Sequence, residues 1–148
     1  MRMTFINPEA FGVPRGYTNG VLIDGGRLLF IAGQIAWDGE QRIVSDDFSE
    51  QFAQALGNVI AVVQAAGGEA IHIAQMRVYV TDKHAYTSNL KQIGAVYREL
   101  MGRHYPAMAL VEVAALVEDL AKVEIEAVAC LPAETVPPPA TAIRGETT

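Results

Sequence analysis

The side chains that most often carry out catalysis are scarce in this chain and form no recognisable motif. The three histidines, His72, His84 and His104, have no serine, cysteine or second histidine at a spacing typical of a catalytic or metal-binding site. The lone cysteine, Cys130, excludes an internal disulfide bond and a multi-cysteine metal site. No phosphate-binding glycine loop occurs either. We therefore expect no metal and no cofactor, and the remaining candidates are carboxylates, arginines and tyrosines.

The stretch 105–113 is the strongest candidate for the wall of a binding cleft. It begins with Tyr-Pro and then alternates as a β-strand does, which places Met108, Leu110 and Glu112 on one face. His104 directly precedes this strand, where it is either a group that titrates near the cleft or a structural side chain. The sequence leaves these two alternatives open.

Two glutamates near the end of the chain alternate with apolar residues. Glu124 and Glu126 therefore point to one face of a predicted strand. By the same parity Arg77 points to that face from an earlier strand, and we expect it to pair with Glu126 rather than with a ligand. Glu124 either lines a polar surface together with Glu126 or acts on a ligand.

Hydrophobic periodicity predicts five strands and two helices in the order β-β-α-β-α-β-β. The segment 3–14 is predicted to be irregular, and the first two strands are predicted to form a hairpin through Asp24-Gly25-Gly26. The second strand is nearly continuously apolar, which predicts burial on both faces. The predicted strands are 17–24, 27–35, 73–81, 105–113 and 121–130, and the predicted helices are 48–66 and a second one from 84 or 88 to 101.

These elements predict a single α+β domain over residues 1–131 and a mobile, proline-rich tail over residues 132–148. Two amphipathic helices can cover only one face of a mixed sheet. The other face combines Arg77, Glu124 and Glu126 with apolar Val128, too mixed for a core and too apolar for water alone. Burial against copies of the same chain resolves this, so a homo-oligomer is expected.

Composition narrows the classes of partner. The chain has 148 residues, a hydrophobic content of 51% and a net charge of −6, with an isoelectric point near 5.0. Such an acidic chain is a poor match for a phosphate backbone, so no nucleic-acid partner is expected. No long apolar run suggests a signal peptide or a membrane span, and the expectation is a cytoplasmic protein with no membrane partner.

Six short motifs between residues 14 and 130 follow one another with few gaps. None is specific alone, but the ordered set resembles the YjgF/RidA family of reactive-intermediate (imine) deaminases, which also includes endoribonuclease L-PSP-like proteins. The motifs are Gly16-Tyr17, Ala32-Gly33-Gln34-Ile35, Val63-Gln64-Ala65-Ala66-Gly67, Val78-Tyr79-Val80-Thr81-Asp82, Tyr105-Pro106-Ala107-Met108 with Val111-Glu112-Val113, and Val123-Glu124-Ile125-Glu126-Ala127.

The resemblance implies a chorismate-mutase-like fold, with a mixed β-sheet that has two helices on one face. It also implies a homotrimer in which three sheets enclose a central barrel and small-molecule sites lie in the clefts between subunits. Archetypal members hydrolyse 2-imino or enamine acids to 2-keto acids and ammonia. The family's catalytic glutamate falls on Glu124 in this chain, and the arginine that holds the substrate carboxylate falls on Met108.

The position of Met108 is the main departure from the family pattern, because a thioether carries no charge and donates no hydrogen bond. Leu110 stands where the family often has cysteine or another small residue, and Gly94 stands where it has an asparagine that contacts substrate. The cleft is therefore expected to be more apolar than in the archetype. Arg15, where the family has glycine, is either a replacement for the missing arginine or a solvated loop charge.

Two further residues complete the predicted ligand site. Tyr17 is expected to donate a hydrogen bond to a ligand or to pack at a subunit seam, and Gly33 to let its backbone approach a ligand or to allow tight strand packing. Two functions remain in competition at this point. One is a hydrolase of imines or enamines, and the other is a non-catalytic trimer that binds a small ligand. Ribonuclease activity is disfavoured by the acidic composition.

Overall fold

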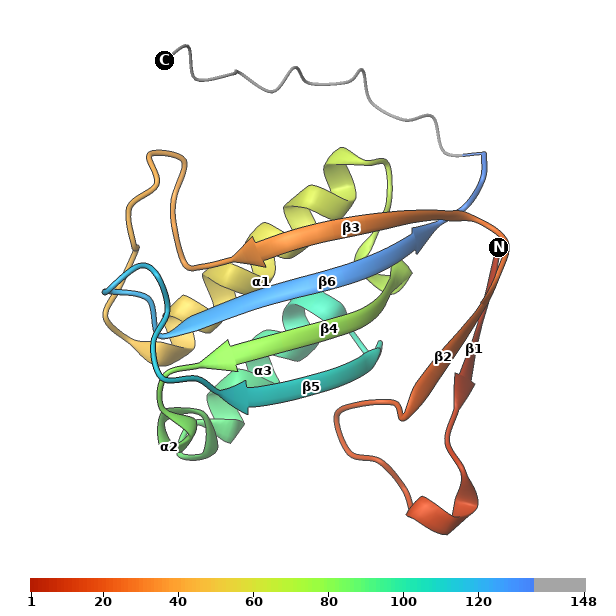
Figure 1. Ribbon diagram of the computed structural model, residues 1–148, viewed down its shortest axis with the longest axis horizontal. Coiled ribbons are helices and arrows are strands. Elements are labelled where there is room, and N and C mark those ends of the chain that lie inside the picture. The colour runs from red at the N-terminus through yellow and green to blue at the C-terminus, as the bar shows by residue number, and fades with distance from the viewer. Residues whose placement is uncertain (135–148) are drawn as a thin grey trace.

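A four-stranded mixed sheet forms the centre of the molecule. The structure is a computed structural model that describes residues 1–134, so residues 135–148 of the predicted tail lie outside the described residues. The strands lie in the order β3 (Arg27–Gln34), β6 (Val123–Leu131), β4 (Ile73–Val80) and β5 (Ala107–Glu112). β4 and β5 run parallel and the other pairs are antiparallel (Figure 1). The predicted mixed sheet is confirmed.

Both long helices lie behind the sheet in Figure 1 and cover a single face. The prediction of two helices on one face is therefore confirmed, and the second one is divided into a short α2 (Lys83–Thr87) and α3 (Leu90–Met101). α1 (Phe48–Ala65) begins where the side chain of Asp47 accepts a hydrogen bond from the amide of Glu50.

The core lies between these helices and the sheet, and it is built from the alternate residues of the strands. Leu56 and Val59 of α1 are fully buried against strand residues such as Val78 and Ile125. Gln51 is a buried polar exception whose amide donates to the carbonyls of Ser45 and Leu120 and accepts from the amide of Lys122. Because its amide oxygen and nitrogen are both paired, Gln51 anchors the loop before β6 to α1.

The N-terminal part of the chain differs from the prediction. Residues Arg2–Ile6 form a strand, β1, where an irregular segment was expected, and it pairs antiparallel with β2 (Gly20–Asp24). β2 therefore does not form a hairpin with β3, and Figure 1 shows the β1–β2 ribbon leaving the sheet. The prediction failed because β2 is paired along its whole length with β1, from Arg2 opposite Asp24 to Ile6 opposite Gly20.

A second prediction was wrong for β3, which was expected to be buried on both faces. Leu28 is 58% exposed and Phe30 is 74% exposed on the face that carries no helix. We call this helix-free face of the four-stranded sheet the open face. Within residues 1–134, no helix is long and apolar enough to cross a membrane.

Candidate functional site

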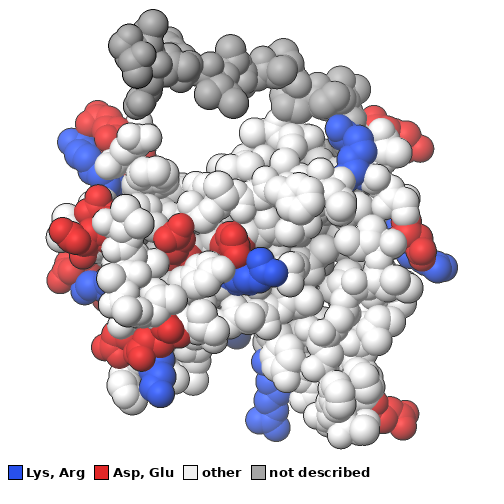
Figure 2. Space-filling model, in the orientation of Figure 1, with Lys and Arg blue, Asp and Glu red and all other residues white. Residues whose placement is uncertain are grey.

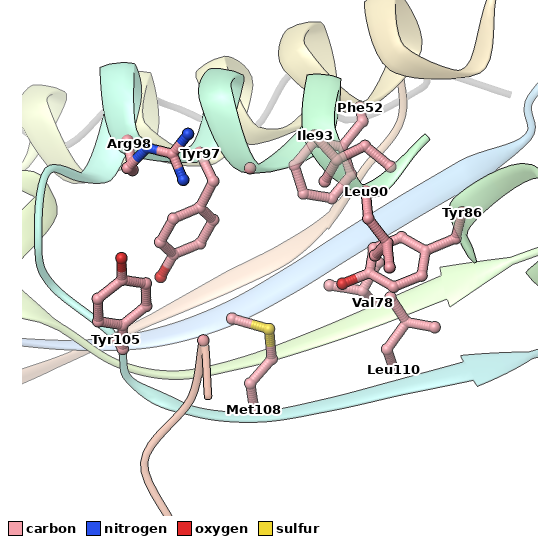
Figure 3. Close-up of a pocket in the computed structure, with 12 residues that line it drawn as sticks. Phe52, Val78, Tyr86, Leu90, Ile93, Tyr97, Arg98, Tyr105, Met108 and Leu110 are labelled. Atoms are coloured by element: carbon pink, nitrogen blue, oxygen red, sulfur yellow. The ribbon is translucent and has the colours of Figure 1, made fainter. Parts of the chain in front are cut away.

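A pocket of about 260 Å³ lies on the helix-covered side, between α3 and the strands β4 and β5. Three of the predicted ligand-binding residues, Gly94, Met108 and Leu110, line it together. Figure 3 shows Met108 and Leu110 projecting from β5. The remaining lining residues are mostly apolar or aromatic: Gly16, Phe52, Val78, Tyr86, Leu90, Ile93, Tyr97, Arg98 and Tyr105.

The loop before β2 closes one side of this pocket. The amide of Thr18 donates to the carbonyl of Pro106 over 3.1 Å, and Thr18 bridges to Ala107 at the start of β5. This contact brings Gly16 to the pocket. The predicted binding residues Arg15 and Tyr17 flank Gly16 but are exposed and do not line the pocket of the single chain.

Residues that the sequence did not single out make up the polar part of the pocket. Tyr97 and Tyr105 stack with their rings 5.4 Å apart, and the hydroxyl of Tyr97 donates to the carbonyl of His104 over 2.7 Å. Burial raises the pKa of Tyr97 well above its usual value, so it stays a neutral donor. Arg98 also lines the pocket. The available signal was its spacing, because residues 94 and 98 are neighbours on a helix face.

The predicted catalytic residue lies elsewhere, on the open face. A Cβ built on Gly33 would overlap Oε1 of Glu124 and lie 2.8 Å from its Cδ, so Gly33 leaves the space that the carboxylate occupies. The β3–β6 register shifts between Ile31 and Gln34, next to this contact. Within residues 1–134, no side chain donates a hydrogen bond to Glu124 or forms an ion pair with it.

The neighbouring Glu126, by contrast, is paired through one of its carboxylate oxygens, Oε1. Glu126 accepts from Arg77 over 3.0 Å and from the hydroxyl of Tyr79 over 2.7 Å, which confirms the predicted pair of Arg77 and Glu126. The hydrogen bonds from Tyr79 and Arg77 hold the pKa of Glu126 below its ordinary value, and the same bond raises the pKa of Tyr79. Of the two predicted glutamates, Glu124 is the one whose carboxylate makes no hydrogen bond and no ion pair within residues 1–134.

Strand register separates the two groups of candidate residues. Met108 and Leu110 pair with Met76 and Val78, which are buried beneath the helices. Glu124 instead pairs with Tyr79, on the other side of the same strand β4. Side chains alternate between the faces of a strand, so Met108 and Glu124 lie on opposite faces of the sheet. One chain alone does not bring them together.

The charge distribution and the ligand types limit the chemistry further. Acidic and basic side chains are interspersed over the open face, with no continuous basic patch in this view (Figure 2). Among residues 1–134, no group of three or more histidine, cysteine, aspartate or glutamate side chains is placed to hold a metal ion. The acid–base candidates on the sheet are therefore carboxylates and tyrosines.

Comparison with known proteins identifies relatives along most of the chain. Residues 9–131 match the family model described as Endoribonuclease L-PSP. The 2-iminobutanoate/2-iminopropanoate deaminase of Salmonella typhimurium is 37% identical over 125 residues, which cover 82% of this chain and 90% of the relative. The human deaminase of the same name is 30% identical over 130 residues, 87% of this chain and 90% of the relative.

A solved structure supports the same relationship. The Rid-family protein YyfB from Yersinia pestis, described as of unknown function, superimposes with a TM-score of 0.78 at 31% identity. The match covers 88% of this chain and 100% of that protein. The predicted α+β fold of the YjgF/RidA type is thus confirmed.

Proposed function

This chain belongs to the Endoribonuclease L-PSP family, which includes the RidA-type deaminases, and on that basis we propose that it hydrolyses a small 2-imino or enamine acid. Water adds to the C=N carbon, and collapse of the resulting carbinolamine releases ammonia and leaves a 2-keto acid. We further propose that it acts in the cytoplasm as a homotrimer, with its sites in the clefts between copies.

The uncommitted carboxylate of Glu124 carries this proposal. A general base has to reach the attacking water with a free oxygen, and general acid–base catalysis contributes typically about 10²- to 10⁴-fold. Glu124 lies against Gly33, where a larger residue would displace it, and it accepts no hydrogen bond within residues 1–134. In the proposed mechanism Glu124 deprotonates the water and then returns a proton to the leaving nitrogen.

Assembly supplies the other half of the proposed site. The open face, which carries the half-buried Glu124, also exposes large apolar side chains, among them Leu28 and Phe30. A neighbouring copy that covers this face would bury them and bring its own pocket around Met108 close to Glu124. Arg15 and Tyr17, exposed beside the pocket in one chain, would lie at the seam between the copies.

The alternative is a non-catalytic trimer that binds a small ligand. The apolar side chains of Met108 and Leu110 favour it, because they replace groups that in the archetype handle a charged substrate. They also support a specificity different from that of the archetype if the chain is an enzyme. The ribonuclease activity that the family's description names is not favoured here, because basic groups on the open face are interspersed with acidic ones.

The test compares two glutamates of the same strand. Imines are generated freshly from L-amino acids with an amino acid oxidase, and the rate of ammonia or 2-keto acid release is measured with and without the protein. Wild type should accelerate release, and Glu124→Gln should lower the protein-dependent rate by about 10²- to 10⁴-fold. Glu126→Gln, which removes a paired carboxylate on the same face, should change it little.

Two outcomes would contradict the proposal. If wild type accelerates release for no imine, the chain is not a deaminase, and stabilisation by 2-keto acids in a thermal-shift assay would then favour the binding protein. If Glu124→Gln and Glu126→Gln reduce the rate equally, Glu124 is not the acid–base group.

A further inference from the structure

The pocket between α3 and β5 has two chemically different ends. Figure 3 shows Tyr86, Leu90, Val78 and Leu110 gathered at one end, and Arg98 with the stacked tyrosines at the other. Met108 lies between the two ends. A ligand that matches this arrangement has a compact apolar body and an anionic group at one end.

Among the described residues that line the pocket, Arg98 is the only one that carries a formal charge. Arg98 is exposed at the mouth of the pocket, and within residues 1–134 its guanidinium makes no ion pair and no hydrogen bond, so its five donors are available to a ligand. The guanidinium extends from α3 on the side of the pocket opposite Met108 and Tyr105 (Figure 3). A planar guanidinium binds a carboxylate through two parallel hydrogen bonds.

Gly94 and Tyr105, which lie near Arg98, both favour binding of a carboxylate there. A Cβ on Gly94 would lie 3.3 Å from Nη1 of Arg98, tighter than an ordinary contact, so the absence of a side chain leaves room for the guanidinium. Tyr105 is held by its stack on Tyr97. Its hydroxyl has no hydrogen-bond partner within residues 1–134, and it points toward α3 (Figure 3). It is thus a second free donor at the same end.

We propose that Arg98 binds the substrate carboxylate and that the apolar end selects 2-imino acids with a branched aliphatic side chain. This inference rests on the proposed deaminase function. In this proposal the carboxylate-binding arginine lies on α3. It faces β5 across the pocket, where Met108 occupies the position of the family arginine. Met108 then serves as an apolar wall against the substrate side chain.

The size of the pocket favours a small side chain. Its volume of about 260 Å³ lies just below the range of about 300–1,000 Å³ that is usual for small-molecule sites. A short branched aliphatic group therefore suits it better than an aromatic or extended one.

Binding of 2-keto acids tests the inference without relying on catalysis. The dissociation constants of pyruvate and 4-methyl-2-oxopentanoate are measured by calorimetry on the full chain. Wild type should bind 4-methyl-2-oxopentanoate about 10- to 100-fold more tightly, because its side chain buries three more carbon atoms. Arg98→Met should weaken that binding by about 10- to 100-fold, the range for hydrogen bonds to a charged group.

Three controls separate charge from shape. Arg98→Lys should restore part of the affinity, since it restores the charge without the planar fork. Arg103→Met, which removes an exposed arginine that does not line this pocket, should leave the affinity unchanged. Binding of 4-methylpentan-2-one, which lacks the carboxylate, should be the same in wild type and Arg98→Met.

The outcomes distinguish this inference from the proposed function. Equal binding of 4-methyl-2-oxopentanoate by wild type and Arg98→Met overturns the inference even if wild type hydrolyses imines. Equal hydrolysis of alanine- and leucine-derived imines overturns the side-chain selectivity. Binding that depends on Arg98 without hydrolysis of any imine supports the ligand class and removes the proposed function.

Discussion

The two faces of the four-stranded sheet differ in how far one chain completes them. On the helix-covered face, Val78 and Ile125 are fully buried, and the pocket with Met108 is closed by α3 and the loop of Gly16. On the open face, Phe30 remains 74% exposed and Glu124 has no partner in residues 1–134. The first face supplies a cavity and the second a free carboxylate, and in the proposed trimer a second copy brings these two surfaces together.

The largest effect is expected from a substitution that disrupts the proposed subunit contact on the open face. Phe30→Glu places a charge where the proposed trimer buries an aromatic ring, and an unpaired charge at such a site costs about 3–5 kcal/mol. We expect the variant to be monomeric and inactive, while its helical circular dichroism remains that of wild type. Light scattering over about a 100-fold range of concentration measures the assembly.

A matched substitution away from the sheet controls for added charge. Val117 is fully exposed in the loop before β6, and Val117→Glu should leave assembly and activity unchanged. A monomeric wild type, or a trimeric Phe30→Glu with full activity, would show that the open face does not join subunits.

The second prediction tests the position of the Glu124 carboxylate on the open face and leaves the proposed trimer intact. Gly33→Ala should push the carboxylate of Glu124 away from its position, because the new Cβ overlaps Oε1. We expect the rate of imine hydrolysis to fall by about 10²-fold, toward the lower end of the range for loss of an acid–base group. The trimer should persist. Gly39→Ala, at a position with nothing within 4 Å, is the control. An unchanged rate in Gly33→Ala would contradict the placement of Glu124.

The smallest effect concerns the helix-covered side and should not depend on assembly. Nε2 of His104 lies 2.6 Å from the carbonyl of Ile73, and burial lowers the pKa of His104 below its ordinary value of 6.5. As pH falls through 6.5, the unfolded chain takes up a proton that the folded chain resists, so stability falls. A single proton changes the free energy of unfolding by at most about 1.4 kcal/mol per pH unit.

Urea unfolding at fixed protein concentration, from about pH 7.5 to about pH 5.5, measures this slope. His104→Gln should be less stable than wild type at neutral pH but should show a flatter dependence in this window. Glu126 contributes only at lower pH, because its pKa is itself lowered. An identical slope in both proteins would mean that another group titrates.

Sequence patterns predicted most of the fold because the relevant signals are local. The stripe of α1 and its cap at Asp47 specify that helix within about 20 residues, and the alternation of Glu124 and Ile125 specifies which face each occupies. The N-terminal ribbon differs from the prediction because the turn signal at Asp24-Gly25-Gly26 does not reveal that β2 pairs with the earlier segment Arg2–Ile6 and not with β3. Burial of β3 on both faces was predicted from its apolar run, but one face of the strand is left uncovered by residues 1–134.

The candidate site was predictable only where family motifs marked it. Glu124 and Gly33 were named separately, but their contact follows from a register shift that no local pattern encodes. The sequence analysis did not single out Arg98, which lies outside the apolar stripe of its helix and is exposed in the structure. Its place in the pocket depends on the packing of α3 over β5, which brings it across from Met108.

The sequence by itself determined most of the helices and strands and the alternation of faces along the strands, because both follow from neighbouring residues. The family motifs marked Met108 as a replacement for arginine. The tertiary structure alone decided that Met108 and Glu124 face opposite sides of the sheet and that Arg98 shares a pocket with Met108. Strand order and helix docking are contacts between segments far apart in the chain, and periodicity carries no information about which segments meet.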